Sequence, residues 1–426
     1  MSRDAVGDWL KFHAYSNELF IDLGLERCRT VMSRLNIGKI GRKVITVAGT
    51  NGKGSSVAIL ESILVSSGYS VGAYTSPHLN SINERIKLNR APISDDKFIN
   101  ALIDIKKHAS KQYLTYFELI TLAAFKIFSE YEPDYAILEV GLGGRLDAVN
   151  CIDADITLIT SIDLDHQNLL GNTREEIGLE KAGVMRAEKF SVCSDPNVPN
   201  SILSYAKLKG AKLSMLGADF SFKKDRENWS WWNKEISYSN LPIDFLTGYH
   251  QLQNASGVLQ TLFLLKESIE PEVVEIGLKS IKLKGRFQSF SCDGYNYIFD
   301  VAHNPEAAKM LARNLECFLE KTGKIHAIIC LSNYKDVQGF LKPLIPLIDF
   351  WYFPTLETNK MASPISLQGE LKKLDAGAQS KLHEGFEQAV FSAREECELG
   401  DFILVSGSFL TIASMSNLLE GVAKDV

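Results

Sequence analysis

The sequence predicts an α/β protein with two domains, each built on a doubly wound, mainly parallel sheet, the second smaller than the first. Three observations lead to this prediction. The chain has 426 residues, which exceeds what one ordinary hydrophobic core accommodates. A strand pattern passes through a glycine-rich turn into a helix at residues 44–56, as at the start of a βαβ unit. Strand and helix patterns then alternate along most of the chain.

Composition and charge narrow the class of protein. Hydrophobic residues make up 45% and charged residues 23% of the chain, as in soluble globular proteins. The net charge of −6 gives no overall attraction for nucleic acid or an anionic membrane, so neither is expected as a partner. The seven cysteines are scattered without a Cys-x-x-Cys pair, and no apolar signal sequence or membrane-length apolar run is present. We therefore expect a cytoplasmic enzyme.

The strand, turn and helix at residues 44–56 form a candidate phosphate-binding loop of the P-loop type. A glycine-rich turn points main-chain N–H groups at one place, where the helix N-terminus and Lys53 add positive charge. In the usual P-loop sequence, a Ser or Thr follows the lysine and binds Mg²⁺. Here Gly54 follows, and the hydroxyls come at Ser55 and Ser56, so the metal ion would need a hydroxyl from elsewhere. The alternative is a tight turn that binds no ligand.

Three polar residues, each near the end of a strand pattern, are candidate ligands for that metal ion: Ser76, Glu139 and His166. The carboxyl ends of parallel strands meet at one edge of a sheet, so these side chains are expected to be close together. Burial of a carboxylate such as Glu139 is costly unless a cation compensates its charge, and Mg²⁺ would do so. The alternatives are a Ser-Pro turn, an exposed strand tip and an isolated turn histidine.

The other elements of the first domain follow in chain order. Helices are expected at 6–35 with a break at 21–27, at 57–68, at 94–110, after Thr115, from about 173 and from 250. Strands are expected at 69–74, 84–88, 134–140 and 156–162. Thr115 and Glu118 have the spacing of a capping box, which is an ordinary local role for both. The tryptophan-rich stretch 211–241 predicts a small antiparallel β insertion.

A basic, glycine-containing stretch at 283–286 predicts a linker, which divides the chain into domains 1–284 and 285–426. The second domain is expected to be a smaller, Rossmann-like α/β unit with strands from 297, at 325–331, at 351–354 and at 402–406. Its first turn lacks a glycine-rich phosphate loop. We therefore expect this domain to close over a nucleotide that the first domain holds.

Several short motifs, in this order and spacing, resemble those of one family. They are IDLGLER at 21–27, GTNGKG at 49–54, SPH at 76–78, LEVGLGGRLD at 138–147, LDH at 164–166, EKAG at 180–183, GRFQ at 285–288, FDVAHNP at 299–305 and GSF at 407–409. The chain is similar, nearly end to end, to the folylpolyglutamate synthase and dihydrofolate synthase family of the Mur ligase superfamily. Each motif is weak alone, but the combination is highly specific.

The resemblance implies ATP-dependent formation of an amide bond. In this family a substrate carboxylate is phosphorylated to an acyl phosphate, the amine of L-glutamate attacks it, and phosphate leaves. ATP and Mg²⁺ are the implied cofactors, with two metal sites and a monovalent cation as a further candidate. The implied ATP contacts are Thr50, Asn51, Gly52, Lys53, Gly54, Ser55, Asn254, Arg286 and Asp300.

The resemblance also assigns metal ligands and catalytic residues. Ser76, Glu139 and His166 match the family's magnesium ligands. Lys181 matches its carbamylated lysine, and carbamylation would turn an ammonium group into an anion that binds a second metal ion. The implied catalytic residues are Lys53, Lys181 and His303.

Loops of the first domain match the family's dihydropteroate contacts. The matching residues are Asp22, Leu23, Gly24, Leu25, Thr115, Tyr116, Phe117, Glu118, Leu146, Asp147 and Ala148. This favours a bifunctional enzyme that makes dihydrofolate and then adds glutamates to reduced folates. A folylpolyglutamate synthase without the first activity is the main alternative, and a Mur-type peptide ligase or a nucleotide-binding switch explains fewer motifs. A monomer is expected, because one chain supplies both sides of such a site.

Overall fold

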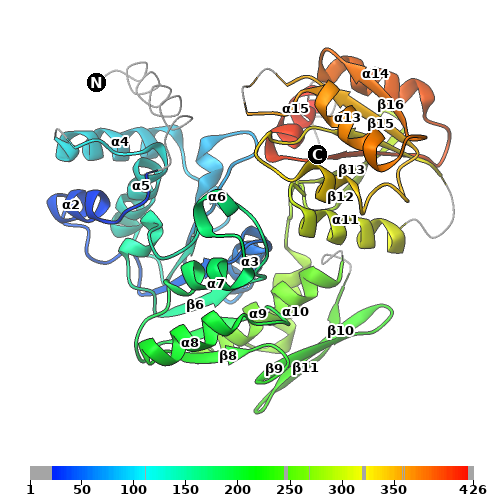
Figure 1. Cartoon of the computed structure of the whole chain (residues 1–426). Helices are drawn as coiled ribbons and strands as arrows, with labels where there is room; N and C mark the ends of the chain where they lie inside the picture. The colour runs from blue at the N-terminus through cyan, green and yellow to red at the C-terminus, as the bar shows by residue number, and fades with distance from the viewer. Residues whose placement is uncertain are drawn as a thin grey trace. The chain divides into compact units, whose positions relative to one another are not determined.

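The computed structural model describes residues 22–110, 112–243, 248–267, 269–318, 323–356, 358 and 360–420. The chain divides into two compact units, Met1–Ile281 and Lys282–Val426 (Figure 1). Each unit is built on a sheet with helices, so the predicted α/β class is confirmed. The first part of the helix expected at 6–35 lies outside the described residues, and the second part is α2 (Glu26–Arg34).

The first unit is built on an eight-stranded sheet with the order β4-β3-β2-β5-β1-β6-β7-β8. Its strands are β1 (Lys43–Ala48), β2 (Val71–Tyr74), β3 (Ile86–Leu88), β4 (Ala91–Pro92), β5 (Tyr135–Glu139), β6 (Ile156–Ile159), β7 (Phe190–Cys193) and β8 (Lys212–Met215). Strands β3 and β4 are antiparallel additions at one edge, and the others run parallel. Because β1 lies between β5 and β6, the loops after these three strands are neighbours.

Several helices of this unit begin where the sequence supplies a cap or a glycine turn. They are α3 (Lys53–Ser66), α4 (Asp95–Ala109), α5 (Tyr116–Tyr131), α6 (Gln167–Leu170), α7 (Arg174–Ala182), α8 (Asn200–Lys209), α9 (Tyr249–Leu264) and α10 (Pro271–Lys279), with short 3₁₀ turns η1 (Ile82–Arg85) and η2 (Ala148–Cys151). Thr115 and Thr173 cap α5 and α7 through complete capping boxes. Helices α2, α4 and α5 pack together, whereas α9 and α10 pack against α3 (Figure 1).

A small antiparallel sheet is present, but it begins later than expected. Strands β9 (Phe220–Lys224), β10 (Asn228–Asn233) and β11 (Ser237–Pro242) form it in the order β11-β10-β9. The prediction of an insertion starting at 211 was wrong for residues 212–215, which form β8 and pair in parallel with β7. Trp229 and Trp231 are buried while Trp232 is exposed, as the alternation of a half-buried strand requires.

The second unit has a six-stranded sheet with the order β12-β13-β17-β14-β15-β16. Its strands are β12 (Gln288–Cys292), β13 (Tyr295–Asp300), β14 (Ile325–Ile329), β15 (Phe350–Pro354), β16 (Gln379–His383) and β17 (Phe402–Ser406). Its helices are α11 (Pro305–Phe318), α12 (Val337–Leu341), α13 (Pro364–Leu374), α14 (Phe386–Glu396) and α15 (Phe409–Glu420). The four expected strands are present. The two edge strands, β12 and β16, were missed because they are polar and largely unburied.

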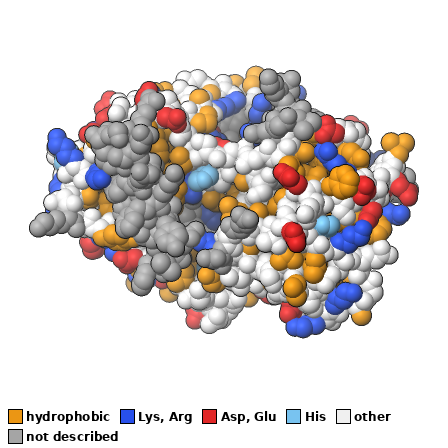
Figure 2. Space-filling model, turned by 90° about the horizontal axis from the view of Figure 1, so that it is seen from above, with side chains coloured by type: hydrophobic (Ala, Val, Ile, Leu, Met, Phe, Trp, Pro, Cys, Tyr) orange, Lys and Arg blue, Asp and Glu red, His pale blue; other side chains and the backbone are white. Residues whose placement is uncertain are grey.

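The surface carries side chains of both charges, as expected from the similar numbers of acidic and basic residues in the sequence. On the face in Figure 2, acidic and basic side chains are interspersed with apolar ones. Over the described parts of the chain, no helix has both the length and the hydropathy that a bilayer crossing requires.

Candidate active site

The loop between β1 and α3 has the backbone geometry of a phosphate-binding turn. Gly49 and Gly52 both have positive φ angles, +146° and +88°. A Cβ on Gly49 would lie 1.8 Å from Thr160 Oγ1, and a Cβ on Gly52 would lie 2.3 Å from Asn254 Oδ1, so both positions require glycine. Lys53 starts α3, and its ammonium group donates to the Gly49 carbonyl oxygen at 2.9 Å. The loop therefore joins a helix N-terminus and a lysine, and Asn254 packs against it.

The end of β6 holds this loop in place. The Thr50 N–H donates to the Ser161 carbonyl oxygen at 2.7 Å, and Thr50 Oγ1 accepts from the Asp163 N–H at 3.0 Å. Thr160 Oγ1 donates to the Asn51 carbonyl oxygen at 2.7 Å. No motif marks these supporting residues in the sequence; the signal for them is their position at the end of β6, the parallel neighbour of β1. Gly54 and Ser55 lie in the first turn of α3.

Two of the three candidate metal ligands are joined in the structure. Ser76 follows β2, Glu139 ends β5, and these strands are parallel neighbours. The Glu139 carboxylate is buried and accepts a hydrogen bond from the Ser76 N–H at 3.1 Å. His166 follows β6 at the N-terminus of α6, and its side chain is 44% exposed. The Glu139 carboxylate and the Ser76 hydroxyl are oxygen donors of the kind that fits Mg²⁺, and His166, which follows β6 on the far side of β1, would add a nitrogen donor.

The Lys181 side chain contacts the phosphate loop. It is a buried residue of α7, and its ammonium group donates to the Gly49 carbonyl oxygen at 2.8 Å. Burial and the nearby charge of Lys53 lower the pKa of Lys181 to about 7, against the opposing effect of Asp165 and Asp147. A large fraction of the amine is therefore neutral near pH 7, and a neutral amine is the form that reacts with CO₂. The residues fit the implied carbamate.

The glycine-rich loop after β5 packs on the helix that carries Lys181. A Cβ on Gly144 would lie 2.9 Å from the Glu180 carbonyl oxygen, and a Cβ on Gly183 would lie 2.4 Å from the Arg145 Cβ. Arg145 also forms an ion pair with the Glu180 carboxylate at 2.8 Å. These glycines are required for close packing between the loop and α7, which positions Lys181.

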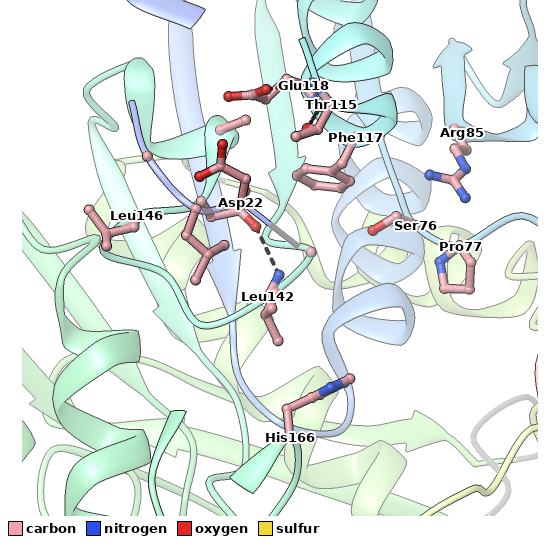
Figure 3. A pocket seen from close by; sticks show the side chains of 15 residues that line it. Asp22, Ser76, Pro77, Arg85, Thr115, Phe117, Glu118, Leu142, Leu146 and His166 are labelled. Atoms are coloured by element: carbon pink, nitrogen blue, oxygen red, sulfur yellow. Dashed lines mark hydrogen bonds between the residues drawn. The ribbon is translucent and has the colours of Figure 1, made fainter. Parts of the chain in front are cut away.

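Next to these groups, the first unit contains a cavity of about 300 Å³. Its lining residues are Asp22, Leu23, Gly24, Ser76, Pro77, Arg85, Thr115, Phe117, Glu118, Gly141, Leu142, Leu146, Asp147, Ala148 and His166. Figure 3 shows Thr115, Phe117 and Glu118 on one wall, with Ser76, Pro77 and Arg85 along another. All the residues matched to dihydropteroate contacts line this cavity except Leu25 and Tyr116, and two candidate metal ligands, Ser76 and His166, line it as well.

One wall of the cavity is tied together by Arg27. Its guanidinium group donates to Glu118 Oε1 at 2.9 Å and to Asp22 Oδ2 at 2.6 Å. The Glu118 carboxylate also accepts from the Thr115 N–H at 2.7 Å, so its capping role and its place in the wall coexist. Arg27 was not among the predicted site residues, although it ends the matched 21–27 motif.

Asp147 is a buried carboxylate that also lines the cavity. Its Oδ2 accepts from the Leu142 N–H at 2.8 Å (Figure 3), and its Oδ1 accepts from the Val149 N–H at 2.9 Å. Burial raises the pKa of Asp147 to about 6, although these N–H groups and the Lys53 charge oppose the rise. The carboxylate thus holds the loop after β5 in shape, and Asp147 lines the cavity.

Arg85 is a cation in the cavity wall that the sequence analysis passed over as part of a strand. It is nearly buried, donates from Nε to His78 Nδ1 at 2.9 Å, and lies 5.5 Å from the centre of the Tyr116 ring. Burial and the Arg85 charge lower the pKa of His78. The Tyr116 ring thus packs against the Arg85 guanidinium group. The sequence does contain a signal for this role: Arg85 is a charged residue within an expected strand, and it lies close to Ser76 in the chain.

The predicted residues of the second unit gather at the carboxyl end of β13. Asp300 is the last residue of β13, and its carboxylate accepts two main-chain N–H bonds at 2.8 Å. Burial raises the pKa of Asp300, against those bonds and the charge of Arg286. Arg286 lies 5.3 Å from the ring centre of Phe409, and His303 is 6.1 Å from the same ring. Arg286, Asp300 and His303 thus lie close together in the second unit.

Comparisons with known proteins agree with this geometry. A family model described as the Mur ligase glutamate ligase domain matches residues 285–409. The dihydrofolate synthase/folylpolyglutamate synthase of Escherichia coli K12 is 37% identical over 97% of this chain and 96% of its own. The structure of E. coli FolC in complex with DHPP and ADP has a TM-score of 0.92 at 36% identity, over 97% of both chains. A bifunctional folylpolyglutamate synthase/dihydrofolate synthase with Mn, AMPPNP and L-glutamate bound has a TM-score of 0.87 at 37% identity, over 96% of this chain and 97% of its own.

Proposed function

This chain belongs to the dihydrofolate synthase/folylpolyglutamate synthase family, and from this premise we propose how its residues divide the work of that activity. The enzyme is an ATP-dependent ligase of folate synthesis. It joins L-glutamate to dihydropteroate and to tetrahydrofolate polyglutamates, through an acyl phosphate that the glutamate amine attacks. ATP and a divalent cation are its cofactors. The names of these relatives do not support the alternatives of a Mur-type peptide ligase or a nucleotide switch.

The phosphate loop is the proposed site for the ATP phosphates. Its support is the turn geometry at Gly49 and Gly52, the N-terminus of α3 and the Lys53 ammonium group. Asn254 packs against Gly52, which supports its assignment as an ATP contact. Thr50, Asn51, Gly54 and Ser55 complete the proposed set in this unit. Lys53 would stabilise the negative charge that develops on the transferred phosphoryl group.

Ser76, Glu139 and His166 are the proposed ligands of Mg²⁺, which supplies charge neutralisation for phosphoryl transfer. Lys181, once carbamylated, is proposed to bind a second ion. The support is its burial under the loop and the lowered pKa of its amine. A monovalent cation remains a further candidate cofactor.

The cavity beside these groups is the proposed site for dihydropteroate. It has both apolar residues, such as Phe117 and Leu142, and carboxylates, and the amino and ring N–H groups of a pterin are natural donors to carboxylates. Arg85 and the metal candidate Ser76 lie along the same wall of the cavity (Figure 3). We propose that the substrate carboxylate faces Arg85 and Ser76, and that the pterin faces the wall of Asp22 and Glu118.

The second unit is the proposed glutamate-ligase domain, with the domain boundary between residues 284 and 285. The family match at 285–409 supports this assignment. Arg286 and Asp300 are the proposed ATP contacts from this domain, and His303 is proposed to assist the reaction. The seven free cysteines support a reducing compartment, so the cytoplasm is the proposed location.

The observation that carries the bifunctional assignment is the convergence of the predicted dihydropteroate contacts on one cavity. The test is product analysis with ATP, Mg²⁺ and L-glutamate, with dihydropteroate and tetrahydrofolate offered in parallel. Both should gain glutamate, and phosphate should be released only when acceptor and glutamate are present together. Failure on dihydropteroate alone would leave a monofunctional folylpolyglutamate synthase. Phosphate release with ATP alone would count against a ligase.

A further inference from the structure

Three metal-ligating side chains meet in the second unit, away from the groups assigned to the ligation. His326 is the second residue of β14, Asp401 directly precedes β17, and Cys397 follows α14. His326 is fully buried, Asp401 is nearly so, and Cys397 is partly exposed. Their ligand atoms all lie within 4.8 Å of one another. The cluster is at the amino ends of parallel strands, whereas Asp300 is at the carboxyl end of β13, so the two lie at opposite edges of this sheet.

The main chain fixes the loop that carries two of these side chains. Asp401 Oδ1 accepts from the Lys324 N–H at 2.7 Å, at the start of β14. Gly323 and Gly400 have φ angles of +107° and +100°, and a Cβ on Gly323 would lie 2.0 Å from the Gly400 carbonyl oxygen. This close packing holds Asp401 beside β14 without help from a ligand.

The hydrogen bonds around His326 direct its Nε2 atom toward the Asp401 carboxylate. His326 Nδ1 is 2.9 Å from the Tyr352 hydroxyl oxygen, and that hydroxyl donates to Glu396 Oε2 at 2.8 Å. Because the hydroxyl has one hydrogen, Nδ1 must carry the proton of this contact. In neutral His326, Nε2 is then a lone pair 3.3 Å from Asp401 Oδ2. Two acceptors remain this close only with a proton or a cation between them.

The donor atoms and the charge balance select the class of ion. Nitrogen, sulfur and oxygen donors together suit Zn²⁺ and similar transition-metal ions, whereas Mg²⁺ and Ca²⁺ prefer oxygen alone. A dication with a thiolate, a carboxylate and a neutral imidazole has no net charge, which limits the cost of burial. The Tyr352–Glu396 pair would orient the His326 ring, as outer partners commonly do for a metal-bound histidine.

We propose that His326, Cys397 and Asp401 form a binding site for a Zn²⁺-class divalent cation, which fastens the end of α14 and the loop 397–401 to the sheet of the second unit. On binding, the Cys397 thiol loses its proton to solvent and its sulfur coordinates the ion. His326 Nε2 and a carboxylate oxygen of Asp401 coordinate from the buried side, and the partly exposed cysteine marks the side of entry.

Co²⁺ is the probe for this site, because a thiolate ligand gives a charge-transfer absorption band. The full chain, stripped with a chelator and kept in excess Mg²⁺, is titrated with Co²⁺. The band should appear, saturate at one ion per chain and disappear on addition of Zn²⁺. Cys397→Ser should remove it, whereas Cys317→Ser, at an exposed cysteine of α11, should leave it unchanged. Tyr352→Phe should keep the band but weaken binding by about 10–100-fold.

Two results would overturn the site. One is a folded chain that gives no thiolate band, which would leave His326 and Asp401 as a simple ion pair. The other is a band that survives Cys397→Ser. If that variant does not fold, thermal unfolding of the unmodified chain decides the question. Zn²⁺ should raise the Tm of the stripped protein in proportion to binding, and an unchanged Tm would refute the proposal.

Discussion

Glu139 and Lys181 are charged residues at positions where an isolated charge would be costly. Both are buried, one at the end of β5 and the other on α7. The contacts to the Ser76 N–H and the Gly49 carbonyl oxygen place them on two sides of the phosphate loop region. At the residue scale, the proposed site therefore combines a buried acid, which we propose as a metal ligand, with a buried amine, which we propose to be carbamylated.

Glu139→Gln tests the metal role. The amide keeps the shape and an acceptor for the Ser76 N–H but loses the charge that would bind Mg²⁺. We expect turnover to fall by about 100-fold or more, with an almost unchanged Tm. Phosphate release measured against Mg²⁺ concentration is the readout. Glu130→Gln, on an exposed side chain of α5, is the matched control. Normal turnover in Glu139→Gln would show that Glu139 is not a metal ligand.

Lys181 gives a second prediction through its lowered pKa. Carbamylation consumes the neutral amine and CO₂, and the neutral fraction of an amine with a pKa of about 7 increases as the pH rises through that value. After CO₂ removal, activity should return on re-equilibration with CO₂ and, at a fixed concentration of dissolved CO₂, faster above pH 7 than below it. Lys181→Ala should be inactive and partly recovered by a short carboxylate. Exposed Lys189→Ala is the control. Full activity without CO₂, or in Lys181→Ala, would contradict the carbamate.

At the scale of elements, the loop after β5 and helix α7 act as one packed pair. Gly144 touches the main chain at Glu180 and Lys181, and Gly183 touches Arg145. The loop also carries Asp147, which lines the cavity. Close packing of backbone on backbone thus links the position of the buried lysine to the shape of the proposed dihydropteroate site.

Gly144→Ala should disturb this packing. The added methyl group would lie 2.9–3.1 Å from backbone atoms of α7, which cannot move as a flexible side chain can. We expect a loss of about 1–3 kcal/mol in the free energy of unfolding and a clear fall in turnover. Denaturant unfolding and a turnover assay measure these effects. Gly38→Ala is the control, because a Cβ there meets no atom within 4 Å. Equal behaviour of the two variants would show that this packing is unimportant.

At the scale of the whole molecule, the proposed roles are divided between the two compact units. The dihydropteroate cavity and the phosphate loop belong wholly to the first unit, whereas Arg286, Asp300 and His303 belong to the second. Substrate binding and turnover should therefore respond differently to a change in the second unit.

Arg286→Gln tests this division. Turnover should fall strongly, because the guanidinium group is a proposed ATP contact. The affinity for dihydropteroate, measured by direct binding without ATP, should stay within about twofold, since distant and independent sites do not couple strongly. A large loss of dihydropteroate affinity would mean that the two functions are not separable in this way.

The sequence by itself determined the α/β class, the glycine-rich loop after β1, the capping box at Thr115 and the strand-end residues. These features depend on local chemistry: glycine turns, hydroxyl caps and the period of apolar residues. The family motifs extended this to the residues of the proposed dihydropteroate site. The polar edge strands β12 and β16 gave no such signal, and the start of the antiparallel insertion was misplaced.

Only the tertiary structure decided which of these residues share a cavity. It placed Arg85 in the cavity wall, Arg27 against the wall residues Asp22 and Glu118, Lys181 against the phosphate loop, and His326 beside Cys397 and Asp401. Each of these contacts joins residues far apart in the chain, such as Arg27 and Glu118. Such contacts depend on how the sheet and its helices pack, and packing is a property of the whole unit that no local pattern contains.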